Sequence, residues 1–482
     1  MPLSRLKERP IYQWNTTPRW LTLLLWLAVV LASCVFTFRG PLRASSSYGN
    51  DFAAPYVSAR LWLQHQNPYD PAAFLPEWHR AGASPGPVNA NPSSTHSVYP
   101  PPSIVALLPL SLLTWPVASK LLVFISVSFY LTAIVMLSTL VPGTWREPLK
   151  PLFIIYGLLF APAHSALHVT NVACISASFL FIALYLLLDT KSKGNKLRSG
   201  SSYKESSHRW PSRFVTNLKL DFDTRIIIVC LLSLSLCIKP TLAPLVLIYL
   251  LWARFFRILA ATIVAVTVLC TVSIYPLVKS NSAWFASLQS NLHFIFFNGT
   301  ADLALRNLTR FDRIDLQLPA YLITGSRTAA LTIALFISVI LIVLWLSAGL
   351  RRMNSVTSAV TYPAAFQPNS CASADLDEHL LHLSSLLTIG LLPTYQRYYS
   401  AVLLLIPVLW AFRNLKTTQA RWLLALCSVF LVNTSVIPKM LGLINNLSHP
   451  VRDTLIGAHV CWILLLIAMF QIWILRSLNR EK

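Results

Sequence analysis

Residues 20–38 read WLTLLLWLAVVLASCVFTF, an apolar run that contains no charged side chain. A helix rises about 1.5 Å per residue, so a run of this length spans most of the roughly 30 Å hydrocarbon core of a bilayer. Long apolar runs recur along the chain at residues 117–141, 168–188, 257–278, 327–349, 397–412, 420–437 and 455–475. The sequence therefore predicts an all-α polytopic membrane protein.

The composition leads to the same class. Of the 482 residues, 55% are hydrophobic and only 12% are charged, about half the charge of an ordinary soluble domain. This excludes a soluble enzyme and a disordered chain. The recurring long runs also exclude a transmembrane barrel, whose strands alternate in segments of about 10 residues. The net charge of +22 fits lysines and arginines gathered in cytoplasmic loops, and we expect no nucleic-acid partner because no clustered basic surface is readable.

The cysteines and the common catalytic motifs indicate no metal or cofactor. None of the eight cysteines forms a CxxC pair or a metal-binding spacing, and no P-loop, GxGxxG, GxSxG or HExxH motif occurs. Leu31-Ala32-Ser33-Cys34 resembles a lipoprotein cleavage site, but the apolar run continues to Phe38. We therefore predict an uncleaved first span.

Charge distribution predicts the topology. Five shorter apolar runs lie at residues 101–114, 151–164, 225–238, 241–253 and 380–394. A helix over 101–114 reaches only about 21 Å, so we predict that it is re-entrant or interfacial. About twelve crossings then remain, and the basic loop 191–225 falls on the same side as both termini. The positive-inside rule makes that side cytoplasmic, and we expect the protein in the plasma (inner) membrane.

The segments between the apolar runs belong to one domain, residues 1–482. The first outer loop, 39–100, is long and rich in proline, serine, asparagine and aromatic residues, and a second outer loop covers 279–326. Residues 189–224 are rich in serine and lysine and predict a flexible cytoplasmic loop. No internal repeat is visible.

Asp51 is the first candidate for chemistry. Phe52, Tyr56, Ala59 and Leu63 recur at helical spacing, so a short helix is predicted along the outer surface. Asp51 precedes that helix and is a good N-cap. It is also a carboxylate at the membrane edge, able to take a proton from a hydroxyl group. The two roles are compatible.

Two proline-containing turns follow in the same loop. NPYD, residues 67–70, has turn chemistry, and Asp70 is either a structural turn residue or a sugar contact. YPPP, residues 99–102, leads into the 101–114 helix. Its prolines act as a wedge, or Tyr99 offers an aromatic platform for a sugar.

Lys239 lies between two unusually short apolar runs, 225–238 and 241–253. If both are half-length crossings, this lysine lies below the outer surface of the membrane. A lysine at depth costs on the order of 2.5–3.5 kcal/mol by insertion scales and often marks a site or cavity. The alternative is a lysine that snorkels at the tip of an ordinary hairpin.

Two further positions near outer ends of spans are polar. PTYQRYY, residues 393–399, places Arg397 among three tyrosines, which suits a phosphate or carboxylate ligand. An interfacial aromatic belt explains the same residues without a ligand. Asn171 is either an interhelical hydrogen-bonding residue or a ligand contact.

In their order along the chain these positions resemble glycosyltransferase family 87, membrane enzymes of the GT-C class that use polyprenyl-phosphate sugars. The matching positions are Asp51 and Tyr56, Pro68-Tyr69-Asp70, Tyr99-Pro100-Pro101, Ile238-Lys239-Pro240, and Pro393 through Tyr399. Two departures from the family pattern bear on the sugar and on any histidine-dependent step. His168-Val169 stands where many relatives have Gly-Gln, and Gln396-Arg397-Tyr398 stands where many have histidine.

The resemblance implies a GT-C-like bundle and makes Asp51 the catalytic base of an inverting transfer at the outer face. We expect a polyprenyl-phosphate sugar donor, with mannose the family's best-known sugar, a lipid or glycan acceptor, membrane lipids as surroundings, and no metal. Lys239 and Arg397 are assigned to the donor phosphate. The expected substrate contacts are Tyr56, Asp70, Tyr99, Asn171 and Tyr398.

A secondary transporter is the competing class. About twelve spans and a pair of short, proline-interrupted helices suit a transporter as well. Against it, the sequence shows no duplicated halves, and its polar candidates gather at the outer ends of the spans.

Overall fold

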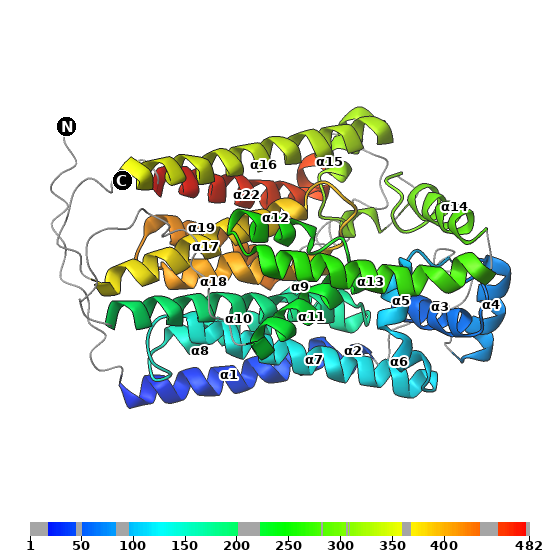
Figure 1. The fold of residues 1–482 in the computed structure, drawn as a ribbon, viewed down its shortest axis with the longest axis horizontal. Helices are drawn as coiled ribbons and strands as arrows, with labels where there is room; N and C mark the ends of the chain where they lie inside the picture. The colour runs from blue at the N-terminus through cyan, green and yellow to red at the C-terminus, as the bar shows by residue number, and fades with distance from the viewer. Residues whose placement is uncertain are drawn as a thin grey trace.

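A computed structural model describes residues 18–44, 51–82, 96–200, 222–280, 283–304, 307, 309–358, 368–433 and 452–478 (Figure 1). These residues form a bundle of helices. Within them there is no β-strand, only an isolated antiparallel bridge between Arg313 and Arg397. The predicted all-α class is confirmed.

In the part of the chain that the structure describes, six helical stretches are long and apolar enough to cross a membrane. They are α1 (Arg19–Arg39) with α2 (Pro41–Ala44), α7 (Trp115–Leu140), α8 (Leu149–Leu159) with α9 (Ala161–His168), α13 (Phe256–Ser280), α16 (Arg327–Ser358) up to Leu350, and α22 (His459–Leu478). Large apolar side chains such as Leu23 on α1, Val264 on α13 and Phe336 on α16 are exposed. Such surfaces suit a lipid environment, and the chain is a multi-pass membrane protein.

Six more helices lie over the other predicted runs. They are α10 (Ala173–Gly200), α11 (Phe222–Ile238), α12 (Pro244–Trp252), α17 (Pro368–Gly390), α18 (Leu405–Arg413) and α19 (Thr418–Ser428). In Figure 1, α10, α17 and α18 lie in the middle of the bundle, with α1 and α16 on opposite edges. Residues 380–392 of α17 and the turn after it are buried almost without interruption, as expected for a helix that is apolar on all sides.

Two predicted segments differ in detail. Residues 101–114 hold two short helices instead of one, α5 (Pro101–Ala106) and α6 (Leu108–Ser111). The break comes just before Pro109, which has no backbone N–H to donate to a preceding turn. In the predicted flexible loop 189–224, α10 continues as helix to Gly200, because no proline interrupts it there. Residues 201–221 lie outside the described residues.

Short helices gather at one end of the bundle. The predicted first outer loop, 39–100, contains α2, α3 (Ala53–Leu63) and α4 (Pro71–Arg80). The second contains α14 (Trp284–Phe297) and α15 (Gln317–Thr324). In Figure 1, α3, α4 and α14 lie together at one end of the molecule. The other elements among the described residues are short helices of the 3-10 or π type: η3 (Arg310–Asp312), η5 (Tyr398–Leu404), η6 (Val429–Leu431) and η8 (Asp453–Gly457).

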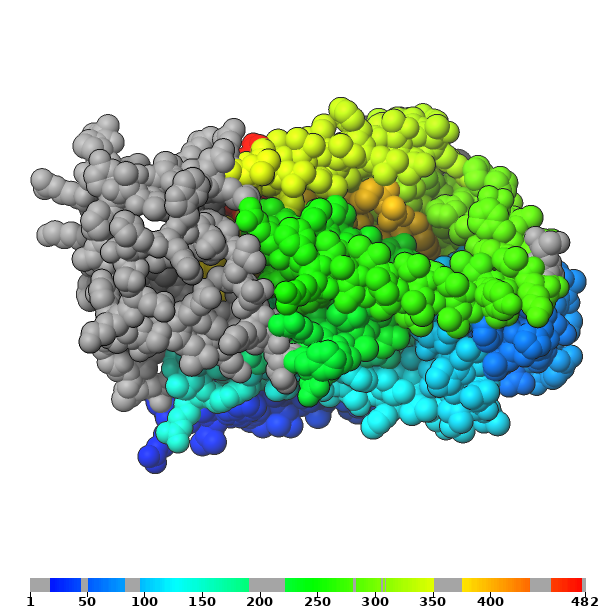
Figure 2. Space-filling view, viewed as in Figure 1, coloured from blue at the N-terminus to red at the C-terminus, as the bar shows by residue number. Residues whose placement is uncertain are grey.

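One side of the bundle is hollowed. Figure 2 shows an elongated depression between α13 and α16, and the chain near residues 400–430, drawn in orange, is visible inside it. The depression therefore reaches from the apolar outer surface toward the central helices.

Candidate functional site

Three turns between spans meet near Asp51. They are residues 169–171 between α9 and α10, residues 239–243 between α11 and α12, and residues 391–397 between α17 and η5. Hydrogen bonds join the three turns to one another and to the first outer loop. Residues far apart in the sequence thereby form one polar cluster.

Asp51 is held from both its backbone and its side chain. Its N–H donates to the Val169 carbonyl oxygen at 2.8 Å, and its Oδ2 accepts a 2.7 Å hydrogen bond from Asn171 Nδ2. Helix α3 begins at Ala53 with Phe52 in the cap position and no side-chain cap. The N-cap interpretation of Asp51 is therefore wrong, because the carboxylate turns toward Asn171. Its Oδ1 accepts no hydrogen bond within the described part of the chain.

Asn171 bridges the carboxylate to a cation. While Nδ2 donates to Asp51, Oδ1 accepts from Lys239 Nζ at 3.2 Å and from the Ala173 N–H at 2.8 Å. The preceding Thr170 has φ of 51°, a conformation that is strained for a β-branched residue and costs on the order of 1–3 kcal/mol. This strained turn sets the entry to α10 and the position of Asn171.

Lys239 is half-buried among polar and aromatic groups at the turn after α11. Its Nζ lies 4.2 Å from the centre of the Tyr399 ring, a cation–π contact. Burial lowers the pKa of Lys239 to about 7, an effect that the nearby Asp51 partly opposes and Arg397 reinforces. In the described part of the chain the ammonium donates only to Asn171, which leaves N–H groups for a ligand.

Arg397 provides the second cation. Its Nε donates to the Tyr395 hydroxyl at 2.7 Å, and its Nη2 lies 3.5 Å from Thr309 Oγ1. Its Nη1 has no hydrogen-bond acceptor among the described residues. Asp51, Lys239 and Arg397 interact electrostatically, so a carboxylate and two cations share the cluster.

Tyr99 lies beside Asp51 in the polar cluster. Its hydroxyl is 3.3 Å from the Asp51 carbonyl oxygen. Burial, followed by the Asp51 charge, raises the pKa of Tyr99. The phenol therefore stays protonated and keeps a hydrogen to donate.

Three of the predicted substrate residues have structural contacts instead. Tyr56 is buried and its hydroxyl donates to the Leu113 carbonyl at 2.7 Å. Asp70 caps α4, accepting a 3.0 Å hydrogen bond from the Ala72 N–H. Tyr398 is buried, and its hydroxyl donates to the Val432 carbonyl at 2.8 Å. None of these contacts joins the polar cluster.

Tyr395 and Tyr399 lie where Tyr398 was expected. A 3-10 helix turns by about 120° per residue, so consecutive side chains of η5 point in different directions. Tyr399 consequently faces Lys239 while Tyr398 faces the core. Sequence reasoning selected Tyr398 from the three tyrosines, and the direction of each side chain at this turn was the missing signal.

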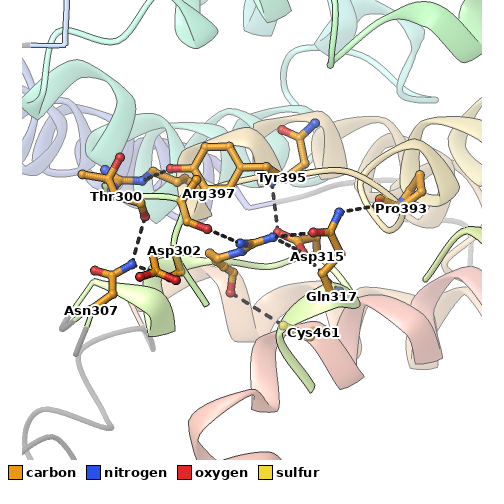
Figure 3. A network of polar contacts seen from close by, with 12 residues as sticks. Thr300, Asp302, Asn307, Asp315, Gln317, Pro393, Tyr395, Arg397 and Cys461 are labelled. Atoms are coloured by element: carbon orange, nitrogen blue, oxygen red, sulfur yellow. Dashed lines mark hydrogen bonds and ion pairs between the residues drawn. The ribbon is translucent and has the colours of Figure 1, made fainter. Parts of the chain in front are cut away.

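Behind Arg397 lies a second polar network, which sequence reasoning missed. Asp315 and Gln317 lie beside the turn that carries Pro393 and Tyr395, and Asp302, which accepts a hydrogen bond from Asn307, lies farther along the same network (Figure 3). Within the described ranges, no group of three histidine, cysteine or acidic side chains has the arrangement of a metal site. Metal independence stays a prediction.

Comparison with known proteins gives one match. A family model described as glycosyltransferase family 87 matches residues 98–362, more than half of the chain. The matched range includes Tyr99, Asn171 and Lys239, while Asp51 and Arg397 lie outside it. No curated protein matches the chain, and no solved structure does.

Proposed function

The chain belongs to glycosyltransferase family 87 and is a membrane glycosyltransferase; we propose that it transfers a sugar from a polyprenyl phosphate to a lipid or glycan acceptor at the outer membrane face. Mannose is the first sugar to test. The observation that carries the proposal is a carboxylate, Asp51, close to two cations, Lys239 and Arg397. Among the residues that the structure describes, Asp51 Oδ1 and some N–H groups of both cations have no hydrogen-bond partner.

The two cations suit a departing phosphate. As the anomeric C–O bond breaks, negative charge grows on the phosphate oxygens. Lys239 Nζ and Arg397 Nη1 would stabilise that charge through charge-assisted hydrogen bonds in a partly dehydrated site. A lipid phosphate needs no nucleotide pocket, which agrees with the absence of glycine-rich phosphate loops from the sequence.

Asp51 would act as general base. Its Oδ1 would take the proton of the acceptor hydroxyl while that oxygen attacks the anomeric carbon from the face opposite the phosphate, which inverts the configuration. Such assistance is worth about 10²–10⁴-fold. Asn171 holds the other carboxylate oxygen and stands between Asp51 and Lys239. In this role it keeps the base from being neutralised by a direct ion pair.

The surroundings suit the rest of the donor. Tyr99 and Tyr395 border the cations and the carboxylate, where aromatic rings could pack on a sugar. The depression between α13 and α16 (Figure 2) would offer room for a prenyl tail that enters from the membrane.

Radiolabel transfer from polyprenyl-phosphate mannose to membrane lipids and glycans, in detergent, tests the proposal. Asp51→Asn should lose activity about 10²–10⁴-fold and keep its unfolding temperature, since an amide oxygen still accepts from Asn171. Asp70→Asn is the matched control, because asparagine is an equally good N-cap for α4, and it should retain full transfer.

The outcomes separate the hypotheses. Equal transfer by wild type and Asp51→Asn would remove Asp51 from the chemistry. If wild type transfers no sugar from any polyprenyl phosphate but moves solute across sealed vesicles, the transporter alternative replaces this proposal.

A further inference from the structure

A buried ion pair lies directly behind the turn that carries Arg397. The side chains of Arg313 and Asp315 are 1% and 0% exposed. Their contact is bidentate, with Nη2 to Oδ1 at 2.7 Å and Nε to Oδ2 at 3.0 Å. An ion pair this deep adds little net stability over well-packed apolar residues of the same volume. The ion pair does fix the relative positions of the Arg313 and Asp315 side chains and of the groups bonded to them.

The pair and its neighbours hold the turn by its backbone. Asp315 Oδ2 accepts from the Gln396 N–H at 3.1 Å, and the Ile314 N–H donates to the Gln396 carbonyl at 3.0 Å. The Leu316 N–H donates to the Leu392 carbonyl at 2.9 Å. These hydrogen bonds hold residues 314–316 alongside residues 392–396 and fix the position of the turn.

Side chains strengthen the same attachment. Gln317 Nε2 donates to the Pro393 carbonyl at 2.8 Å. The guanidinium carbon of Arg313 lies 5.0 Å from the centre of the Tyr395 ring. Figure 3 shows Asp315, Gln317 and Pro393 on one side of this network and Tyr395 with Arg397 on the other.

From the turn, two contacts lead to the two cations of the site. The Tyr395 hydroxyl accepts from Arg397 Nε at 2.7 Å. Gln396 Nε2 donates to the carbonyl of Thr241, two residues after Lys239, at 3.0 Å. One rigid attachment therefore sets the position of both cations.

We propose that the Arg313–Asp315 pair is a positioning unit that fixes Arg397, through Tyr395 and Gln396, at the distance from Lys239 that a phosphate group requires. Neither member of the pair touches the ligand. The phosphate part of the statement rests on the proposed function, whereas the fixing of the turn does not.

Hydrogen exchange of the full-length protein tests the fixing of the turn without any substrate. In wild type the amides of Ile314, Leu316 and Gln396 should be protected. Asp315→Asn retains the shape and one acceptor oxygen, and it should raise exchange in peptides covering 313–317 and 392–397. Glu77→Gln, which breaks a buried carboxylate–arginine contact between α3 and α4, should leave those peptides unchanged. Wild-type exchange in Asp315→Asn would overturn the proposal.

A double-mutant cycle tests the link to the ligand, with farnesyl phosphate as the probe. Tyr395→Phe keeps the ring over Arg313 and removes the oxygen that holds Arg397, so the Kd should rise about tenfold, the scale of one hydrogen bond to a charged group. In an Arg397→Lys background the same substitution should change the Kd less than about twofold. Additive losses would show that Tyr395 acts independently of Arg397 and would overturn the link.

The outcomes of the two experiments distinguish an error in the donor class from an error in the positioning role. If wild type does not bind farnesyl phosphate, the donor class in the proposed function is wrong, and the exchange experiment still decides whether the pair fixes the turn. If the probe binds but exchange in Asp315→Asn matches wild type, the proposed function stands without the positioning unit.

Discussion

The surroundings of Lys239 affect its ionisation and, through it, the recognition of a phosphate. Its ammonium is held between the Asn171 amide oxygen and the Tyr399 ring. Burial disfavours the charged form, which lowers the pKa of Lys239 to about 7. The lysine is therefore cationic below that pH and neutral above it. Because only the cation attracts a phosphate, donor recognition should weaken as the pH rises.

We accordingly expect kcat/KM for the lipid-phosphate donor to fall about tenfold per pH unit above about pH 7, since this ratio reports the ionisation of the free enzyme. Lys239→Arg should remove this alkaline limb, because a guanidinium stays charged. Lys416→Arg, an exposed lysine between α18 and α19, should leave the profile unchanged. An alkaline limb that persists in Lys239→Arg would assign it to another group.

Individual residues also show which parts of the site could be predicted from the sequence. Tyr99, Asn171, Lys239 and Arg397 could be selected because a polar residue at the end of an apolar span is costly and therefore noticeable. The tyrosines of 395–399 could not be told apart, since three residues of one type within five positions carry no directional information. The directions of Tyr398 and Tyr399 come from η5, whose 3-10 form is set by tertiary packing.

At the scale of elements, α3 and α4 depend on one buried acid. Glu77 on α4 is 1% exposed and contacts Arg60 Nε of α3 at 2.6 Å and Arg80 Nη1 at 2.7 Å. Arg60 also lies near the Ser111 carbonyl of α6. This acid therefore joins three short helices next to the segment that begins with Asp51.

Glu77→Gln should lower the free energy of unfolding by about 1–3 kcal/mol, because the neutral amide accepts more weakly and leaves Arg60 poorly paired. Thermal unfolding followed by tryptophan fluorescence measures the loss. Arg80→Ala should cost less than about 1 kcal/mol, as Arg80 is 65% exposed. Equal effects of the two substitutions would contradict a special role for the buried acid.

The helices themselves were the most predictable part of the fold. Each long apolar run overlaps a described helix, because hydropathy in a bilayer reports helices directly. The segment 101–114 was harder, since the break between α5 and α6 depends on Pro109 and on packing. The network of Arg313 and Asp315 was not predictable, because the pair is joined to residues 392–396 only by the fold.

At the scale of the whole molecule, the ends of the helices separate into two groups. Asp51, Asn171, Lys239 and the 391–397 turn meet at one end. At other helix ends, Arg413 contacts Asp377 and the Leu140 carbonyl. If the predicted spans alternate from a cytoplasmic N-terminus and 101–114 does not cross, the turns of the first group are outer, and residues 140, 377 and 413 are inner. The contacts between helix ends therefore agree with the alternation of outer and inner loops that the distribution of charged residues predicts.

Cysteine labelling decides which end faces outward. Ala72 on α4 and Lys416 between α18 and α19 are both exposed and belong to opposite predicted sides. In a background lacking the exposed Cys34 and Cys230, Ala72→Cys should react with a membrane-impermeant maleimide in intact cells. Lys416→Cys should react only after permeabilisation, because basic loops stay in the cytoplasm. The reverse pattern would move the polar cluster to the cytoplasmic face, where nucleotide sugars are available, and would remove the reason to require a lipid-linked donor.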